Sequence, residues 1–174
     1  MTPALMCSAA LLSLLPLALG QRPPADALLP DALQPLQFLV GSCWSGKFKN
    51  GATDTHCFEP VFGHFIRDRH EVVGDKDAYR GETLYRWDAK ERVIRFTYWN
   101  SSGGVSEGTA RSVDGDLVFP ETHRDASGQL QEYRNVWRRT SENAYVALTE
   151  RRIPAGWTES FRIEYRRTGP ASSR

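Results

Sequence analysis

One stretch near the C-terminal end decides the fold: Trp157-Thr158-Glu159-Ser160-Phe161-Arg162-Ile163-Glu164-Tyr165-Arg166. Successive side chains of a β-strand point to opposite faces, so every second residue shares a face. One face then carries Trp157, Phe161, Ile163 and Tyr165, with Glu159 among them, and the other face is entirely polar. This alternation predicts an amphipathic strand whose apolar side is buried.

Similar β-prone runs fill the chain upstream, separated by short turns rich in Gly, Asp and Asn. The predicted strands cover residues 38–48, 54–61, 65–73, 79–87, 92–100, 104–112, 116–121, 130–139, 144–152 and 157–166. Nearly every connection is short enough for a hairpin, which predicts an antiparallel meander. Ten strands in a meander lose their exposed edges by closing. We therefore expect an all-β protein, a ten-stranded antiparallel up-and-down barrel.

The N-terminal segment predicts export. Residues 9–20 form an apolar run too short to anchor in a bilayer, with small residues before Gln21, so we expect residues 1–20 to be a signal peptide. A buried N-terminal helix is the alternative. Residues 21–35 then form a Pro- and Ala-rich lead-in, residues 36–167 the barrel and residues 168–174 a flexible tail. The mature protein is expected to be periplasmic or secreted, without a membrane anchor.

The cysteines agree with export. Cys7 leaves with the signal peptide, whereas Cys43 and Cys57 remain. A hairpin turning at residues 49–51 places these two opposite each other, which predicts a disulfide on the outer wall or rim of the barrel, away from the cavity. Closing a loop of about fifteen residues stabilises a fold by ~3 kcal/mol. Two buried free thiols are the alternative.

Composition and spacing argue against several classes of function. Lys and Arg total 22 against 21 Asp and Glu, and no long basic stretch occurs, so nucleic acid is not an expected partner. No Cys or His pair has the close spacing typical of zinc ligands, so no metal site is expected. The serines lack the context of a nucleophile elbow.

The inward faces of the predicted strands hold many aromatic residues with polar tips, together with Asn, Asp, His and Glu. Buried polar atoms need a protein partner, an ordered water or a ligand. A cavity for a small apolar or amphipathic molecule is therefore expected rather than a dry core. The predicted ligand-binding residues are Asp68, His70, Tyr85, Tyr98, Asn100, Tyr133, Asn135, Trp137 and Glu159.

Asp68 and His70 are two residues apart and share a face of the strand at 65–73. An inward carboxylate beside an imidazole is an arrangement for acid–base chemistry, although a structural ion pair is the alternative. A shifted register would instead turn Arg67 and Arg69 inward and favour an anionic head group. We prefer the first register, because three successive charges on an inward face are costly to desolvate.

Three glutamates, Glu121, Glu150 and Glu159, are candidate interior carboxylates, and burial would raise the pKa of an unpaired one. The alternative is pairing with an arginine across the sheet. No residue is assigned a catalytic role.

The first predicted strand adds a resemblance. Its opening, Leu36-Gln37-Phe38-Leu39-Val40-Gly41-Ser42-Cys43-Trp44-Ser45-Gly46, contains Phe-Leu-x-Gly-x-x-Trp-x-Gly. This string resembles the start of nitrobindin-like and other calycin-type barrels, with one extra residue between Gly and Trp. Segments such as 65–70, 81–88, 100–109 and 119–122 resemble exported bacterial proteins of uncharacterised activity in this group. The resemblance spans residues 36–167 and implies a calycin-like barrel.

The haem-binding members of that group use a histidine late in the chain as the iron ligand. Here the four histidines are His56, His64, His70 and His123, and none lies in the last two predicted strands. The haem site is therefore not carried over, and no cofactor is expected; haem ligation by His56 or His70 is the alternative.

Three functions follow from these observations. The leading hypothesis is an exported barrel that binds a small molecule in a partly apolar cavity. The second is a cavity enzyme, an isomerase or hydrolase, that uses Asp68, His70 or an interior Glu for proton transfer. The third is an envelope interaction protein whose barrel interior is only a core.

Overall fold

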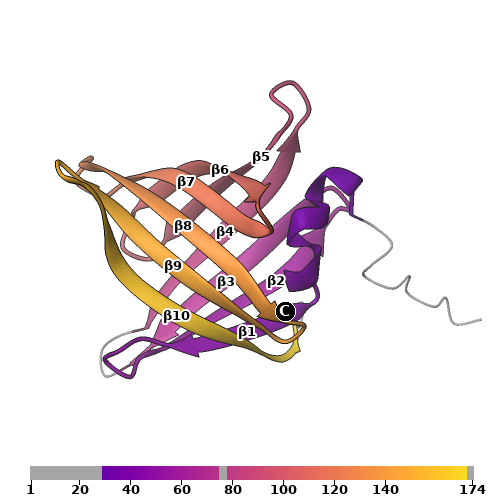
Figure 1. The fold of residues 1–174 in the computed structure, drawn as a ribbon, viewed down its shortest axis with the longest axis horizontal. Coiled ribbons are helices and arrows are strands. Elements are labelled where there is room, and N and C mark those ends of the chain that lie inside the picture. Colours follow the sequence, from indigo (N-terminus) through magenta and orange to yellow (C-terminus); the bar gives the residue numbers. More distant parts are fainter. Residues whose placement is uncertain (1–28, 75–77, 172–174) are drawn as a thin grey trace, which may run out of the picture.

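The structure is a computed structural model that describes residues 29–74 and 78–171. Within these residues the chain forms ten strands, each antiparallel to its neighbours. They are β1 (Ser42–Lys47), β2 (Thr53–Val61), β3 (Phe65–Val73), β4 (Tyr79–Asp88), β5 (Val93–Asn100), β6 (Val105–Val113), β7 (Asp116–Arg124), β8 (Leu130–Ser141), β9 (Ala144–Ile153) and β10 (Gly156–Pro170). β10 pairs with β1 and closes the barrel (Figure 1). The predicted fold class is confirmed.

Strand β3 shows how the alternation sorts side chains between lumen and outer wall. Ile66 and Asp68 are at most 1% exposed and point into the barrel. Arg67 and Arg69 lie on the outer wall, where both form ion pairs with Glu59 of β2. The register preferred from the sequence is therefore present, and the register that turned the arginines inward is wrong.

A 3₁₀ helix, η2 (Asp31–Leu39), lies across one end of the barrel (Figure 1). A 3₁₀ helix has three residues per turn, so Leu33, Leu36 and Leu39 form one stripe, and all three are buried. Trp44 of β1 donates its Nε1–H to the carbonyl oxygen of Leu39 at 3.1 Å. The strand predicted from residue 38 thus begins only at Ser42, because residues 38 and 39 belong to η2.

Strand β10 departs from simple alternation. Its register with β9 shifts between Glu159 and Phe161, which marks a β-bulge. One extra residue inverts the faces of everything before it. Trp157 consequently lies on the outer wall, where it packs under the guanidinium groups of Arg134 and Arg152. The expectation that Trp157 shares the inner face with Phe161 is wrong.

The disulfide between Cys43 and Cys57 is confirmed, with an Sγ–Sγ distance of 1.98 Å and a Cα–Cα distance of 4.0 Å. The two residues are cross-strand partners on β1 and β2, next to the inward pair Trp44 and His56. They therefore lie on the outer wall, and the alternative of two free thiols is wrong.

Several predictions concern the ends of the chain. The signal peptide at residues 1–20 lies outside the described residues. At the other end β10 continues to Pro170, past the predicted boundary at Arg167. Among residues 29–74 and 78–171, no helix has the length and apolar character needed to cross a bilayer.

Candidate functional site

The barrel interior divides into two halves. Near η2 it is filled by apolar side chains, including Ile66, Ile94, Leu117 and Tyr145. The other half contains a partly open cavity of about 430 Å³. The lining residues are Phe48, Asp54, His56, Asp68, His70, Val72, Tyr79, Thr83, Tyr85, Phe96, Tyr98, Ser106, Phe119, Glu121, His123, Tyr133, Asn135, Trp137, Ala147, Thr149, Phe161 and Tyr165.

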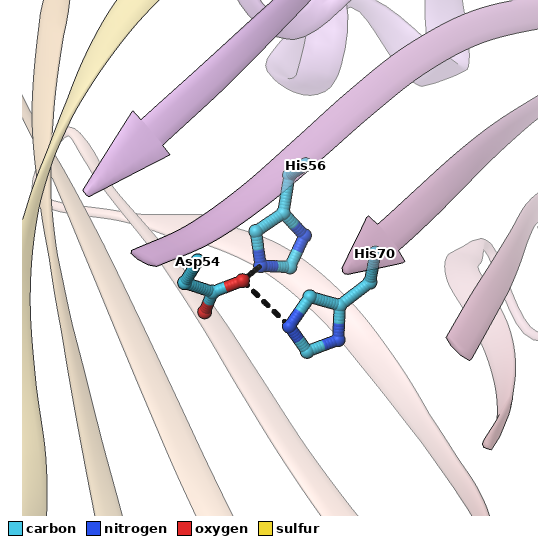
Figure 2. Close-up of side chains that lie close together, drawn as sticks. All are labelled: Asp54, His56 and His70. Atoms are coloured by element: carbon cyan, nitrogen blue, oxygen red, sulfur yellow. Dashed lines mark ion pairs between the residues drawn. The ribbon is translucent and has the colours of Figure 1, made fainter. Parts of the chain in front are cut away.

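Strands β2 and β3 form one polar wall of this cavity, where Asp54, His56 and His70 meet (Figure 2). His56 lies directly opposite His70 in the strand register, and their rings stack with centroids 4.3 Å apart. Oδ1 of Asp54 lies 2.7 Å from Nε2 of His70 and 3.6 Å from Nε2 of His56. One carboxylate oxygen therefore faces two imidazoles at once.

The far sides of these three groups are held by other side chains. Nδ1 of His56 contacts Oδ2 of Asp68 at 2.7 Å, and the Tyr165 hydroxyl donates to Oδ2 of Asp54 at 2.6 Å. Nδ1 of His70 lies 3.3 Å from the Tyr98 hydroxyl. Asp68 thus pairs with His56 rather than with His70, which corrects the dyad expected from the sequence.

A close approach at Gly81 makes room for the Tyr98 ring. Gly81 lies opposite His70 on β4, and a Cβ atom there would stand 2.4 Å from a ring carbon of Tyr98. The missing side chain lets this ring lie over the strand and reach both His70 and Tyr79, whose hydroxyl is 2.6 Å from that of Tyr98.

The wall also leaves polar atoms unsatisfied. Oδ1 of Asp54 and Nε2 of His70 form an ion pair at 2.7 Å, but the two groups are poorly aligned for a hydrogen bond. Both atoms are buried and lack a hydrogen-bond partner among the described residues, as does Oδ1 of Asp68. Buried polar atoms usually have partners. Because Asp54 and His70 form an ion pair with each other, Oδ1 of Asp68 is the atom of this wall that a further group would satisfy.

Charge on the wall is set by the coupling of carboxylates and imidazoles. Burial opposes ionisation of Asp54, but His56 and His70 outweigh it and hold the pKa of Asp54 well below its usual range. Burial likewise disfavours the charged form of His56, yet Asp68 and Asp54 together raise its pKa to about 10. His56 is therefore protonated at neutral pH, which makes it a poor general base.

A second polar group lies on β7, β8 and β9, across the barrel from β2 and β3 in strand order. Asn135 donates from Nδ2 to Oε1 of Glu121 at 3.4 Å, and Thr149 donates to Oδ1 of Asn135. Burial raises the pKa of Glu121 to about 7, because the long hydrogen bond from Asn135 offsets little of the desolvation. Glu121 is thus the lumen carboxyl whose ionisation changes near neutral pH.

Most residues predicted to bind a ligand line the cavity. These are Asp68, His70, Tyr85, Tyr98, Tyr133, Asn135 and Trp137. Asn100 does not line it, because its side-chain oxygen accepts the backbone N–H groups of Ser102 and Gly104 in the turn after β5. Glu159 is also outside, since the bulge in β10 turns it to the outer wall, where it pairs with Arg162 at 3.3 Å.

The three glutamates predicted as candidate interior carboxylates also divide between the lumen and the outer wall. Glu150 pairs with Arg134 on the outer wall, and Glu159 lies outside as well. Only Glu121 of the three lines the cavity.

Several residues that line the cavity were not among the ligand-binding residues predicted from the sequence, above all Asp54 and Tyr165. A signal for Asp54 was present, because Asp54 and His56 are two apart on one strand. The turn between the predicted strands 54–61 and 65–73 is centred on Gly63 and brings residue 56 opposite residue 70. Tyr165 was expected on an inward face, but its contact with Asp54 spans 111 residues and depends on barrel closure.

Two solved structures are similar to this chain. The crystal structure of Rv2717c from M. tuberculosis superposes with a TM-score of 0.54 at 12% identity, over 80% of this chain and 99% of that one. A de novo designed fluorescence-activating β-barrel superposes with a TM-score of 0.38 at 17% identity, over 80% of this chain and 100% of the design. No family model matches the chain. No curated protein matches it either.

At 12% identity the likeness to Rv2717c shows the fold alone. Together with the closed ten-strand order, it supports an up-and-down antiparallel β-barrel.

Proposed function

We propose that this protein is an exported barrel that binds a small molecule in its lumen, a molecule with an apolar body and a neutral or cationic head. The observation that carries the proposal is the cavity of about 430 Å³, in which aromatic side chains and a few buried, charged side chains line one lumen. Concave, largely apolar pockets with a few convergent polar groups are the usual form of small-molecule sites.

The apolar part of the ligand would lie against the rings of Phe96, Phe119 and Trp137. Phe48 and Phe161, in contact with centroids 5.2 Å apart, add an aromatic pair farther from η2, and Phe161 is 38% exposed. Aromatic walls of this kind bind apolar bodies through area burial and ring packing.

The charges of the lining favour a neutral or cationic head group. No Lys or Arg is among the described residues that line the cavity, whereas Asp54, Asp68 and Glu121 are. His56 supplies one positive charge, and it is already shared between Asp54 and Asp68. An anionic head would meet unbalanced carboxylates in a poorly solvated space, which is unfavourable. The arginines that could have bound an anion lie on the outer wall.

Export to the periplasm or the exterior is part of the proposal. The disulfide between Cys43 and Cys57 supports an oxidising compartment, in which such bonds persist. The apolar run at residues 9–20 supports it from the sequence.

Two naphthalene probes of matched size test the proposal: 1-naphthylmethylamine, which is cationic, and 1-naphthoate, which is anionic. Titration calorimetry should show saturable binding of the amine at one site and at least roughly tenfold weaker binding of the carboxylate, a difference of about 1.4 kcal/mol. Val72→Phe should abolish amine binding, since Val72 lines the cavity. Val73→Phe is the matched control, because Val73 is the next residue on β3 and is 52% exposed.

Two results would contradict the proposal. One is no saturable binding of either probe to the folded protein, and the other is equal loss of binding in the Val72→Phe and Val73→Phe variants.

A second candidate function is proton transfer in the same cavity, and the specific observation in its favour is Glu121. A carboxyl group whose pKa is about 7 is well matched to general acid–base work at neutral pH. Glu121 takes the place of the Asp68 and His70 dyad as the proton-transfer group, because Asp68 is engaged by His56.

Deuterium exchange into the methyl group of 2-acetylnaphthalene, followed by NMR, tests this second function. An enzymatic role requires exchange above the buffer rate that falls at least about 100-fold in Glu121→Gln. Exchange at the buffer rate in the wild-type protein would contradict it and leave the binding function unaffected.

A further inference from the structure

We propose that Asp54, His56 and His70 bind one divalent transition-metal ion, with Zn²⁺ as the reference ion, on the β2–β3 wall of the cavity. The proposal goes beyond the binding of an organic molecule, since it requires no ligand other than the ion. It also departs from the expectation of no metal site, which rested on the absence of closely spaced ligands along the chain.

The first observation that supports a metal site is the arrangement of the ligand atoms. One oxygen of Asp54 and one nitrogen from each imidazole all lie within 4.8 Å of one another (Figure 2). Zinc binds imidazole nitrogen and carboxylate oxygen at roughly 2.0–2.2 Å, which separates the ligand atoms of a tetrahedral site by about 3.3 Å. The two nitrogen–oxygen distances here, 3.6 Å and 2.7 Å, lie on either side of that value. The two imidazole rings stack nearly parallel, with an interplanar angle of 9°, so binding requires both rings to turn toward one point. It also requires His56 to release the proton that it holds at neutral pH.

The second observation is that other side chains hold the three ligand residues in place. Metal-binding histidines usually make a hydrogen bond through the ring nitrogen that does not bind the metal, and this contact fixes the ring. Asp68 contacts Nδ1 of His56 at 2.7 Å, and the Tyr98 hydroxyl lies 3.3 Å from Nδ1 of His70. Tyr165 holds the second oxygen of Asp54. Each ligand is thus oriented from behind.

The third observation concerns two buried ligand atoms that make no hydrogen bond. Oδ1 of Asp54 and Nε2 of His70 are buried and have no hydrogen-bond partner among the described residues, although they lie 2.7 Å apart. These are two of the atoms that would contact the ion. Coordination would replace this ion pair with two bonds to the metal ion and so give both atoms well-directed partners.

The donor set indicates the class of ion. Two imidazoles and one carboxylate suit zinc and the neighbouring transition metals, whereas calcium and magnesium prefer oxygen donors alone. Three protein ligands leave a coordination position that faces the cavity, as in sites that bind water or an exogenous ligand. The ion would therefore be accessible from the lumen.

Zinc binding to the full chain, without an affinity tag and after treatment with a chelator, tests the proposal. Titration calorimetry and elemental analysis should show one Zn²⁺ per chain, with a dissociation constant in the micromolar range or below. Asp54→Asn and His70→Asn should each weaken binding by roughly 100-fold or more. Asp68→Asn, which changes only the partner of His56, should weaken it by about 10- to 100-fold.

His123→Asn is the matched control, because His123 is the third histidine lining the cavity and contacts Ser106 rather than the cluster. His64→Asn controls for surface histidines, since His64 is exposed. Both should bind Zn²⁺ like the wild-type protein. Near-UV circular dichroism checks that each variant is folded.

Should the His70 or Asp54 variants fail to fold, the visible spectrum of Co²⁺ bound to the wild-type protein gives a second readout. Intense d–d bands that change in Asp68→Asn support a site of low coordination number built on His56. Absence of saturable Zn²⁺ binding to the wild-type protein overturns the proposal. Zinc binding that survives His70→Asn and is lost in His123→Asn overturns it equally. The naphthalene probes, applied to the same metal-free samples, report separately on the cavity.

Discussion

Glu121 is the residue whose charge links the cavity to pH. Its pKa is about 7 in the folded protein against 4.5 for the ordinary side chain. The folded state therefore holds a proton that the unfolded chain releases between these two values. This contribution to stability is complete below pH 4.5 and is lost as pH rises through 7.

We predict that Glu121→Gln removes this pH dependence. Relative to the wild-type protein, the variant should gain stability between pH 5 and pH 8, by at most about 3 kcal/mol. Urea unfolding of both proteins across that range measures the difference, in which the contributions of other titrating groups cancel. Parallel stability curves for the two proteins would show that Glu121 is ionised normally.

For single residues, the sequence predicted which side of the barrel wall a side chain faces better than it predicted which side chain it contacts. Period-two alternation placed Asp68, His70 and Tyr98 in the lumen, where they are found. It did not predict that Asp68 pairs with His56, because the choice between two imidazoles depends on how β2 lies against β3. Asn100 was misplaced because its turn captures the side chain, which satisfies backbone N–H groups instead of facing the lumen.

The first hairpin is the element that the disulfide secures. Cys43 and Cys57 are separated by 14 residues and face each other across β1 and β2. Replacing both with Ala should lower the free energy of unfolding by about 3 kcal/mol, mainly because the unfolded chain gains conformational freedom. Chemical denaturation measures this loss. Reduction of the wild-type protein should produce a similar loss, and an unchanged denaturation midpoint in both cases would contradict the prediction.

The helix η2 is the element that seals one end of the barrel. Leu36 is 1% exposed, so Leu36→Ala should cost about 2–5 kcal/mol of stability. Leu130→Ala is the control, because Leu130 is 54% exposed and its truncation should cost less than about 0.5 kcal/mol. Thermal unfolding compares the two. Equal effects would mean that η2 does not act as a plug.

Strands were predictable as elements because most of their boundaries are marked by Gly, Asp or Asn turns. The bulge in β10 was not, since no residue near Ser160 signals the extra position. Its consequence is large, because it moves Trp157 and Glu159 to the outer wall. The helix η2 was only partly predicted: residues 21–35 were expected to be extended or loosely helical, and residues 38 and 39 also fit a strand.

Over the whole molecule, barrel closure creates the cavity and concentrates its chemistry. The β2–β3 wall and the group around Glu121 come from opposite sides of the strand order, yet both face one lumen. The ring of Trp137 on β8 contacts His56 of the β2–β3 wall, with centroids 6.2 Å apart, and Phe119 of β7, with centroids 4.5 Å apart. Closure was predictable from the strand number and short turns. The size of the cavity depends on how much of the interior is filled by the apolar side chains near η2. The alternation of residues along single strands does not predict this.

Labelling with 5-fluorotryptophan tests the central claim, that the lumen binds a small molecule, most directly. The chain has five tryptophans, and Trp137 lines the cavity, whereas Trp99 is 42% exposed and Trp157 lies under arginines on the outer wall. Saturation with 1-naphthylmethylamine should shift the fluorine resonance of Trp137 and leave those of Trp99 and Trp157 in place. A shift of Trp99 or Trp157 while Trp137 stays unchanged would place binding on the outer surface and contradict the account.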